Sequence, residues 1–422
     1  MEHDLVLLGR VVLPSGIRET EIGISEGVIA EVGYNLRGSR RIDAERSLIF
    51  PGFADIHVHL REPGWEKKED YRTGTRAAAH GGVTTVADMP NNPIPATTKA
   101  TIALKRRLAD EKAVIDVKLY GGVSASDLER AKEISGDVVA YKIFLSESTG
   151  SLAFPTSELR NALRIIADTS KPVSLHCESQ AVIDATRERL VGGKGDYADL
   201  RPPGAEVEAV ETLVSTMKEI PGLRANVCHA SVAETLERAR LARRDGLRLT
   251  SEVALHHLYF SRRALDGNRL LNTNPPLRSE EDRQAMIQGL RSENVSFLVT
   301  DHAPHLEDEK SEFGFAGVPG LDDFAHVVSW LIKNQGVDPS VMAKVASSNP
   351  SEYLGLTDRG VISPGKRADF AILDLYSPEE VKRDQILSKC GWSPYEGKTF
   401  PGRIRWTIRG GEPLVDDYEI AV

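Results

Sequence analysis

Cysteine, long apolar runs and positive charge are all scarce in this chain, and each shortage excludes a class of protein. Three cysteines are too few for a disulfide framework, so we expect a protein of the reducing cytoplasm. No apolar run reaches the roughly 18 residues that a transmembrane helix needs, and the first residues lack the basic and apolar segments of a secretory signal. The net charge of -9 and the lack of a basic stripe argue against a nucleic-acid partner.

The composition is instead that of an ordinary globular protein. Hydrophobic residues make up 41% of the 422 residues and charged residues 27%. A chain of this length can build a large core and more than one domain. Composition narrows the function no further, so the interpretation depends on the motifs.

The middle of the chain alternates between strand-like and helical patterns. Eight short runs rich in Val, Ile, Leu and Thr predict strands at 54–59, 83–89, 115–120, 138–144, 172–177, 223–229, 248–253 and 295–301. Helical patterns fill most gaps, for example at 98–111, 157–168, 206–218, 232–244 and 280–291. Eight such units predict a (β/α)8 TIM barrel. A doubly wound sheet is the alternative, but its Gly-rich nucleotide loop is missing after the first strand.

Both ends of the chain look β-rich. Short apolar runs separated by turn residues occur at 5–13 and 22–29, and again at 369–374 and 406–411. The two ends could pair, so we expect a small β-sandwich domain formed by both termini. The predicted domains are therefore residues 1–49 and 359–422 for the β-sandwich and residues 50–358 for the barrel.

Residues of metal-ligand type stand at the ends of five predicted strands. His57 and His59 end the first strand, and side chains two residues apart on a strand point to the same side. The others are Lys142 on the fourth strand, His176 on the fifth, His229 on the sixth and Asp301 on the eighth. Because active sites of such barrels form where the strands end, we expect these six side chains to converge and hold two metal ions.

The donor set favours zinc, but one anionic ligand is missing. Four histidines and one aspartate are sparse for two divalent ions. Lys142 would supply the bridge if carbon dioxide added to its neutral amine, giving an N-carboxylated lysine. The alternative is an ordinary ion pair between Lys142 and a buried carboxylate. Cys177 and Cys228 adjoin two of the histidines, and strand alternation predicts that both face the surrounding helices as core residues.

At this point the sequence resembles a known family. The segment Pro51–Gly64, with its His57-Val58-His59-Leu60-Arg61 core, resembles the signature of dihydroorotases, which are cyclic amidohydrolases of the amidohydrolase superfamily. Further similar segments lie at 68–70, 81–85, 88–91, 274–278 and 300–305, so the resemblance spans nearly the whole chain.

The resemblance implies a complete set of site residues. Metal ligands fall on His57, His59, Lys142, His176, His229 and Asp301, with two Zn²⁺ per subunit and Lys142 as the carboxylated bridge. Substrate contacts fall on His59, Arg61, Asn91, Asn274 and His305, and backbone contacts on Ala316 and Gly317. A guanidinium suits the ring carboxylate of dihydroorotate, and related hydantoinases and allantoinases act on rings without that acid. The alternative for Arg61 is a surface ion pair with Glu62 or Glu66.

The implied activity is the reversible conversion of (S)-dihydroorotate to N-carbamoyl-L-aspartate in de novo pyrimidine (UMP) biosynthesis. The hydroxide that bridges the metals attacks the cyclic amide carbonyl, and Asp301 acts as general acid and base. The loop at 146–151 is either a mobile cover or an ordinary βα loop.

Two other functions remain as alternatives. A hydantoinase or allantoinase would share the fold, metals and mechanism. An inactive dihydroorotase-like partner of a carbamoyltransferase is disfavoured because the ligand set is complete. The expected partner is a small-molecule substrate, with no nucleic acid and no membrane, and either a homodimer or association with aspartate carbamoyltransferase is open.

Overall fold

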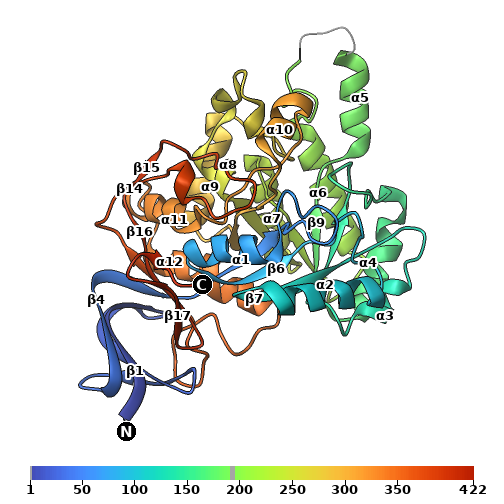
Figure 1. Ribbon diagram of the computed structural model, residues 1–422. Helices are drawn as coiled ribbons and strands as arrows, with labels where there is room; N and C mark the ends of the chain where they lie inside the picture. The colour runs from blue at the N-terminus through green and yellow to red at the C-terminus, as the bar shows by residue number, and fades with distance from the viewer. Residues whose placement is uncertain (1, 191–194) are drawn as a thin grey trace.

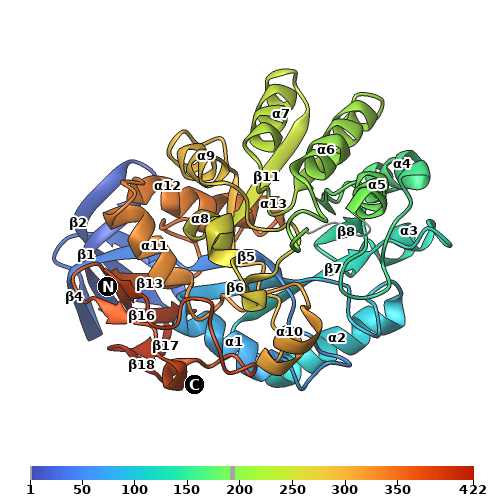
Figure 2. The ribbon, with the colours of Figure 1, turned by 90° about the horizontal axis from the view of Figure 1, so that it is seen from above.

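The computed structural model of the protein describes residues 2–190 and 195–422. Its centre is a sheet of eight parallel strands in the order of the sequence (Figure 2). The strands are β5 (Phe53–Val58), β6 (Val83–Asp88), β7 (Asp116–Gly122), β8 (Ala140–Phe144), β9 (Val173–His176), β10 (Arg224–Val227), β11 (Arg248–Ala254) and β12 (Phe297–Val299). Val58 pairs with His302, just after β12, and so brings the two outer strands together. The predicted (β/α)8 barrel is confirmed, and each strand begins and ends within two residues of its predicted run.

Thirteen α-helices occur in the described residues, and most surround the barrel (Figure 2). They are α1 (Tyr71–His80), α2 (Lys99–Lys112), α3 (Arg130–Ile134), α4 (Leu159–Asp168), α5 (Gln180–Leu190), α6 (Pro203–Met217), α7 (Ala233–Arg244), α8 (Leu255–Tyr259), α9 (Glu280–Arg291), α10 (Glu307–Phe313), α11 (Phe324–Lys333), α12 (Pro339–Ala343) and α13 (Asn349–Tyr353). Shorter helical turns lie at Thr156–Glu158, Arg262–Leu265, Arg269–Leu271, Lys344–Ser348 and Arg383–Gln385.

Helix α9 shows how the sequence specifies these helices. The Ser279 side chain caps its first turn by accepting from the backbone N–H of Asp282. Acidic residues occupy the first turn and Arg291 the last, which complements the helix dipole. Met286 and Leu290 lie four residues apart on the buried face, so this face packs into the barrel core.

The two termini form one eight-stranded sheet beside the barrel (Figure 1). Its strands are β1 (Glu2–Leu13), β2 (Gly16–Ser25), β3 (Val28–Gly33), β4 (Arg37–Pro51), β13 (Phe370–Asp374), β16 (Arg403–Arg409), β17 (Glu412–Asp416) and β18 (Glu419–Ile420). The ends meet where β13 pairs antiparallel with β4, with Ile372 opposite Ile49. The expected pairing of the two termini in one β domain is confirmed.

Strand alternation lets this sheet serve two cores. Ile49 and Ile372 point into the core of the terminal sheet, whereas their neighbours Phe50 and Leu373 point into the core of the barrel. Successive side chains on a strand face opposite sides, so one strand can pack in both directions. The terminal sheet is therefore joined to the barrel by a continuous apolar contact.

The C-terminal part also reaches the barrel mouth. Between β13 and β16 the chain forms a short hairpin of β14 (Glu379–Glu380) and β15 (Thr399–Phe400). The intervening segment packs on the loops after β12, where Trp392 Nε1 donates to the carbonyl of His305 over 2.8 Å. The backbone N–H of Ser388 donates to Asp322 over 3.1 Å. This segment supports residues of the candidate site.

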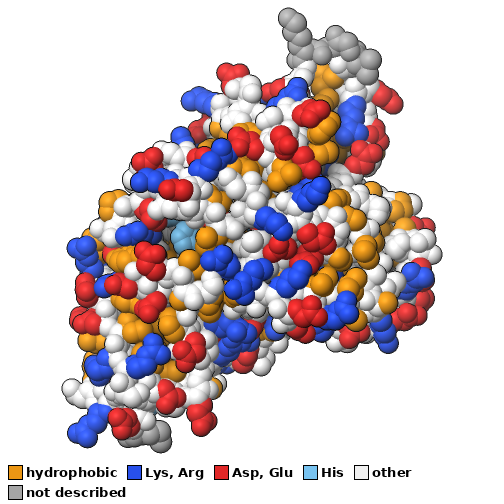
Figure 3. All heavy atoms as spheres, viewed as in Figure 1, with side chains coloured by type: hydrophobic (Ala, Val, Ile, Leu, Met, Phe, Trp, Pro, Cys, Tyr) orange, Lys and Arg blue, Asp and Glu red, His pale blue; other side chains and the backbone are white. Residues whose placement is uncertain are grey.

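The surface carries charges of both signs. Figure 3 shows acidic and basic side chains interspersed over one face of the molecule. Among the described residues, no helix combines the length and apolar character that crossing a bilayer requires.

Candidate metal centre and substrate pocket

The barrel mouth gathers the predicted site residues. Ten of the twelve line one pocket: His57, His59, Arg61, Asn91, His176, His229, Asn274, Asp301, Ala316 and Gly317. The other two, Lys142 and His305, are buried beside it. Lys142 stands next to the lining residue Phe144, with its Nζ 4.9 Å from the ring centre. The residues therefore converge from strands far apart in the sequence, as the barrel requires.

In His57 and His59, the ring nitrogen that points away from the pocket is hydrogen-bonded to an acceptor oxygen. His57 Nδ1 donates to the carboxylate of Glu252, a buried residue of β11. His59 Nδ1 lies 2.8 Å from Asn91 Oδ1, and the amide orientation follows because Asn91 Nδ2 donates to the Thr149 carbonyl over 2.7 Å. Since each acceptor oxygen fixes the hydrogen on Nδ1, the Nε2 lone pair of both rings faces the pocket.

A second histidine pair lies across the pocket. His176 Nε2 donates to Glu178 over 2.8 Å, which leaves the Nδ1 lone pair on the inner side. That atom is 3.0 Å from His229 Nε2. The ring centres of His57 and His229 are 5.2 Å apart, so the two pairs adjoin. This is the histidine–carboxylate arrangement that orients imidazole ligands toward a metal.

The inner atoms of the first pair are all electron-rich. His57 Nε2 lies 3.4 Å from Asp301 Oδ1, and His59 Nε2 lies 3.3 Å from the same oxygen. His57, His59 and Asp301 thus form one of the groups whose ligand atoms could hold a metal. Two nitrogen lone pairs and a carboxylate repel one another unless a proton or a metal cation lies between them. The donor set and its orientation therefore fit divalent metal ions.

Burial keeps these imidazoles neutral. Desolvation is the largest cause that lowers the pKa of His57, His59, His176 and His229, and the positive charge of Lys142 lowers each of them further. Neutral imidazole is the form that ligates metals. Burial is also the largest cause that raises the pKa of Asp301, and it opposes ionisation of this carboxylate.

Lys142 has no acidic partner in the part of the chain that the structure describes. Its Nζ donates to Cys228 Sγ over 2.8 Å and lies within 4.0 Å of no carboxylate oxygen there. The expected alternative, an ion pair with a buried carboxylate, is therefore not formed. The charge of Lys142 acts on Glu252 and Asp301 without contact, and a buried ammonium that forms no ion pair is costly, which disfavours the unmodified ammonium at this position.

The prediction for Cys228 was wrong. We expected its side chain to face the helices, but it points into the barrel beside Lys142 and His57. The alternation fails because β10 ends at Val227 and His229 takes a left-handed backbone with φ of 33°. Cys177, in contrast, lies in the apolar core as expected.

Arg61 and His305 present unused donors. Arg61 Nε donates to the Pro304 carbonyl over 3.0 Å, and no ion pair joins Arg61 to Glu62 or Glu66 among the described residues. Arg61 Nη2 and His305 Nε2 are both buried and lack a hydrogen-bond partner within the same residues. The charge of Arg61 lowers the pKa of His305, after the larger effect of burial, so the two residues lie within electrostatic range of each other.

The loops after β11 and β12 complete the pocket. Asn274 Oδ1 accepts from the hydroxyl of Tyr197, which leaves its Nδ2 for a ligand. Gly317 N–H donates to the Asn272 carbonyl over 2.9 Å, and a Cβ on Gly317 would clash with the Ala303 carbonyl. Gly317 has φ of 126°, so glycine is required at this close approach.

Sequence reasoning missed several residues that hold the ligands. Glu252 orients His57 and accepts from the N–H of His229 over 3.1 Å, and Glu178 orients His176. Tyr197 supports Asn274. A signal existed for Glu252, because a carboxylate inside an otherwise buried strand is costly unless it has a partner.

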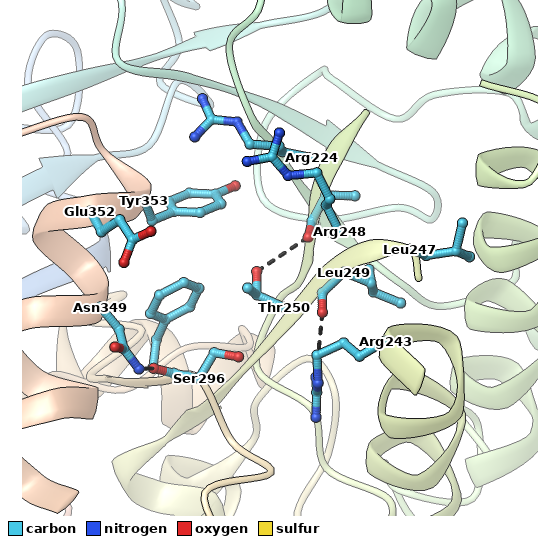
Figure 4. Close-up of a pocket in the computed structure, with 12 residues that line it drawn as sticks. Arg224, Arg243, Leu247, Arg248, Leu249, Thr250, Ser296, Asn349, Glu352 and Tyr353 are labelled. Atoms are coloured by element: carbon cyan, nitrogen blue, oxygen red, sulfur yellow. Dashed lines mark hydrogen bonds between the residues drawn. The ribbon is translucent and has the colours of Figure 1, made fainter. Parts of the chain in front are cut away.

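A larger cavity of about 330 Å³ lies at the opposite end of the barrel (Figure 4). Two of its three arginines are engaged by backbone carbonyls: Arg243 donates to Asn294 over 2.7 Å and Arg224 to Ser170 over 3.0 Å. Figure 4 also shows Arg243 donating to the Leu249 carbonyl. These groups close the N-terminal end of the barrel, which in this fold serves stability.

Comparison with known proteins identifies the family of this chain. Residues 48–414 match the Amidohydrolase family. The chain is 33% identical to a dihydroorotase of Pyrococcus furiosus over 99% of this chain and 94% of the relative. It is 32% identical to an allantoinase of Bacillus licheniformis, over 97% and 95% of the two chains. The protein belongs to the amidohydrolase family and is a metal-dependent hydrolase of its cyclic amidohydrolase branch.

A solved structure supports the fold. The L-hydantoinase of Arthrobacter aurescens superposes with a TM-score of 0.95, at 24% identity, over 100% of this chain and 98% of that one. The relatives thus divide among dihydroorotase, allantoinase and hydantoinase.

Proposed function

We propose that the protein is a dihydroorotase, which interconverts (S)-dihydroorotate and N-carbamoyl-L-aspartate in pyrimidine biosynthesis. One observation supports this choice of substrate: the buried donors Arg61 Nη2 and His305 Nε2 have no partner among the described residues. A buried guanidinium nitrogen without an acceptor is costly. A carboxylate on the substrate ring would satisfy both donors at once.

His57, His59, His176, His229, Asp301 and an N-carboxylated Lys142 would hold two Zn²⁺ ions. Metal ions bound there supply an activated water and a polarised carbonyl for amide hydrolysis. Lys142 forms no ion pair within residues 2–190 and 195–422, which favours carboxylation, because the carbamate is an anionic ligand that replaces a buried ammonium without a contacting carboxylate.

Asp301 moves the proton in this proposal. Its carboxylate faces His57 and His59 at the pocket, where it accepts a proton from the attacking water and returns it to the leaving amide nitrogen. Asn274 Nδ2 and the backbone of Ala316 orient the ring, whereas Gly317 shapes the pocket wall because its N–H is already bonded to Asn272. Asn91 acts mainly through His59, since both ends of its amide are already bound.

A substrate panel tests the assignment. The purified enzyme, supplied with zinc and bicarbonate, should hydrolyse dihydroorotate and cyclise N-carbamoyl-L-aspartate. Dihydrouracil has the same ring without the carboxylate, so it should react far more slowly. Equal kcat/KM for the two rings would contradict the proposal.

Arg61→Met provides the matched variant. It should raise KM for dihydroorotate about tenfold to a hundredfold, the effect of one to two charged hydrogen bonds. Its residual kcat/KM for dihydrouracil should stay that of the unaltered enzyme, since that ring has no carboxylate. An unchanged KM for dihydroorotate would refute the contact.

Metal content and lysine modification are measured separately. Elemental analysis after gentle purification should give two zinc ions per chain. Intact mass in mild, neutral solution should show a labile carbon dioxide adduct that a Lys142→Met variant lacks. Less than one zinc per chain after loading would contradict the two-ion centre.

Allantoinase is the second candidate, favoured by the 32% identity to the Bacillus licheniformis enzyme. Allantoin and hydantoin therefore belong in the panel, and a preference for either would replace the first assignment. An inactive scaffold that binds aspartate carbamoyltransferase would fail on every ring and retain no zinc. Size-exclusion chromatography with and without that partner would test a homodimer against the complex.

A further inference from the structure

His305 is fixed from three directions. Trp392 Nε1 donates to its carbonyl over 2.8 Å, and the ring of Phe315 lies 5.2 Å from the imidazole, centre to centre. On the imidazole itself, Nδ1 is 3.0 Å from Lys68 Nζ. The remaining ring nitrogen, Nε2, is buried and has no hydrogen-bond partner among the described residues.

The contact with Lys68 determines where the hydrogen of the imidazole sits. An ammonium group only donates, so His305 Nδ1 must accept. Burial and the charges of Arg61 and Lys68 lower the pKa of His305, so the ring is neutral. A neutral imidazole whose Nδ1 accepts carries its hydrogen on Nε2. The charge of Arg61 and the backbone of Ala316 both act on the pKa of the His305 imidazole, and both residues line the substrate pocket.

We propose that Lys68 is a positioning residue, which holds His305 in the Nε2–H tautomer so that this nitrogen and Arg61 together donate to an anionic group of the substrate. The identity of that group as the ring carboxylate rests on the function proposed above. The tautomer does not, because it follows from contacts within the chain.

Lys68 is itself held in place. Its Nζ is 3.0 Å from Glu309 Oε2 and lies over the rings of Phe315, at 5.1 Å, and Trp65, at 5.6 Å. Burial lowers the pKa of Lys68, and the Glu309 carboxylate counters this by favouring the ammonium.

Glu309 also supplies the alternative acceptor. Its Oε2 is 3.8 Å from His305 Nδ1, and Lys68 Nζ contacts both atoms. When the ammonium is removed, the carboxylate becomes the polar group nearest to Nδ1 and would draw the hydrogen to that nitrogen. Nε2 would then present a lone pair to the substrate anion, and attraction would turn into repulsion.

Nitrogen NMR of the full-length enzyme tests the tautomer directly. In protein labelled with ¹⁵N-histidine, long-range proton–nitrogen spectra distinguish Nε2–H from Nδ1–H imidazole, and a His305→Gln spectrum assigns the signal. We expect Nε2–H in the unaltered enzyme, Nδ1–H or a mixture in Lys68→Met, and Nε2–H again in Lys68→Arg. An Nδ1–H tautomer in the unaltered enzyme overturns the proposal, even if Lys68→Met fails to fold.

Kinetics supply a second readout. Lys68→Met should raise KM for dihydroorotate about tenfold or more, as for loss of a hydrogen bond to a charged group, with a smaller change in kcat. Lys68→Arg should restore KM. Lys67→Met, at the exposed neighbouring lysine, is the matched control and should behave like the unaltered enzyme.

The two proposals fail in different ways. If Lys68→Met keeps the Nε2–H tautomer and an unchanged KM, Lys68 does not position His305. If the tautomer responds as expected but dihydroorotate is not a substrate, only the assigned activity is wrong, and the KM comparison moves to whichever ring the panel identifies.

Discussion

The two ends of the barrel differ in whether their buried polar side chains have hydrogen-bond partners. At the C-terminal mouth, Arg61 Nη2, His229 Nδ1 and His305 Nε2 are buried without hydrogen-bond partners among the described residues. At the N-terminal floor, Arg224 and Arg243 donate to backbone carbonyls, and within the described residues no buried side-chain atom of that cavity lacks a partner.

The presence of unpaired buried polar groups distinguishes the functional end of the barrel from the structural end better than the size of the cavity does. The floor cavity measures about 330 Å³ and the mouth pocket about 30 Å³, yet only the mouth combines converging lone pairs with unused donors. Unsatisfied buried polar groups are rare in native proteins because they are costly. Where they cluster, a ligand that satisfies them is the physical explanation, and substitutions at the two ends should therefore affect different measurements.

The largest effect is expected at Asp301. Asp301→Ala should abolish turnover, by about a thousandfold or more, because general acid–base groups contribute on that order and this carboxylate is also an expected metal ligand. The fold should persist. Activity and circular dichroism measure the two properties, and retention of even a tenth of the activity would refute the role of Asp301.

The backbone at Asp301 calls for a matched variant. Its φ of 47° is left-handed, a conformation that Asn tolerates better than Ala. Asp301→Asn should therefore be as inactive as Asp301→Ala but closer in thermal stability to the unaltered enzyme. This pair separates loss of the carboxylate from backbone strain.

A smaller effect is expected at Glu252, which touches no substrate in the proposed site. Glu252→Gln should weaken zinc affinity or activity about tenfold to a hundredfold, the usual cost of altering a group that orients a ligand histidine. Competition with a chelator measures the affinity. Excess zinc should restore part of the activity, and an unchanged zinc affinity would show that His57 does not depend on Glu252.

The strands of the barrel and their ends could be predicted from the sequence because a strand that is buried on both faces is a continuous apolar run. Each barrel strand is a short apolar run, and the ligand residues stand where that run stops. His57 and His59 were placed correctly for this reason. Roles for the predicted ligands remain proposals, since their position alone assigns no metal.

What the sequence could not supply was local geometry. The positive φ of His229 turns the Cys228 side chain inward, and no residue pattern in the sequence predicts this backbone conformation. Glu252 and Tyr197 support ligands from distant segments, so only the closed barrel brings them into contact. Asn91 lines the pocket and its substrate contact stays a prediction, whereas the link that its amide makes between His59 and Thr149 was not predicted.

The smallest catalytic effect is expected at the floor. Arg243→Met removes the donor to the Asn294 carbonyl and should lower the free energy of unfolding by about 1–3 kcal/mol, the cost of leaving such a group unsatisfied. The kcat/KM of the folded fraction should not change, because the substitution lies at the far end of the barrel. Arg248→Met is the control: Arg248 is exposed and forms no ion pair in the described part of the chain, so the change in stability should stay within about 0.5 kcal/mol. Urea unfolding measures the free energy of unfolding of both variants. A loss of kcat/KM in Arg243→Met at unchanged stability would contradict the assignment of function to the mouth and of stability to the floor.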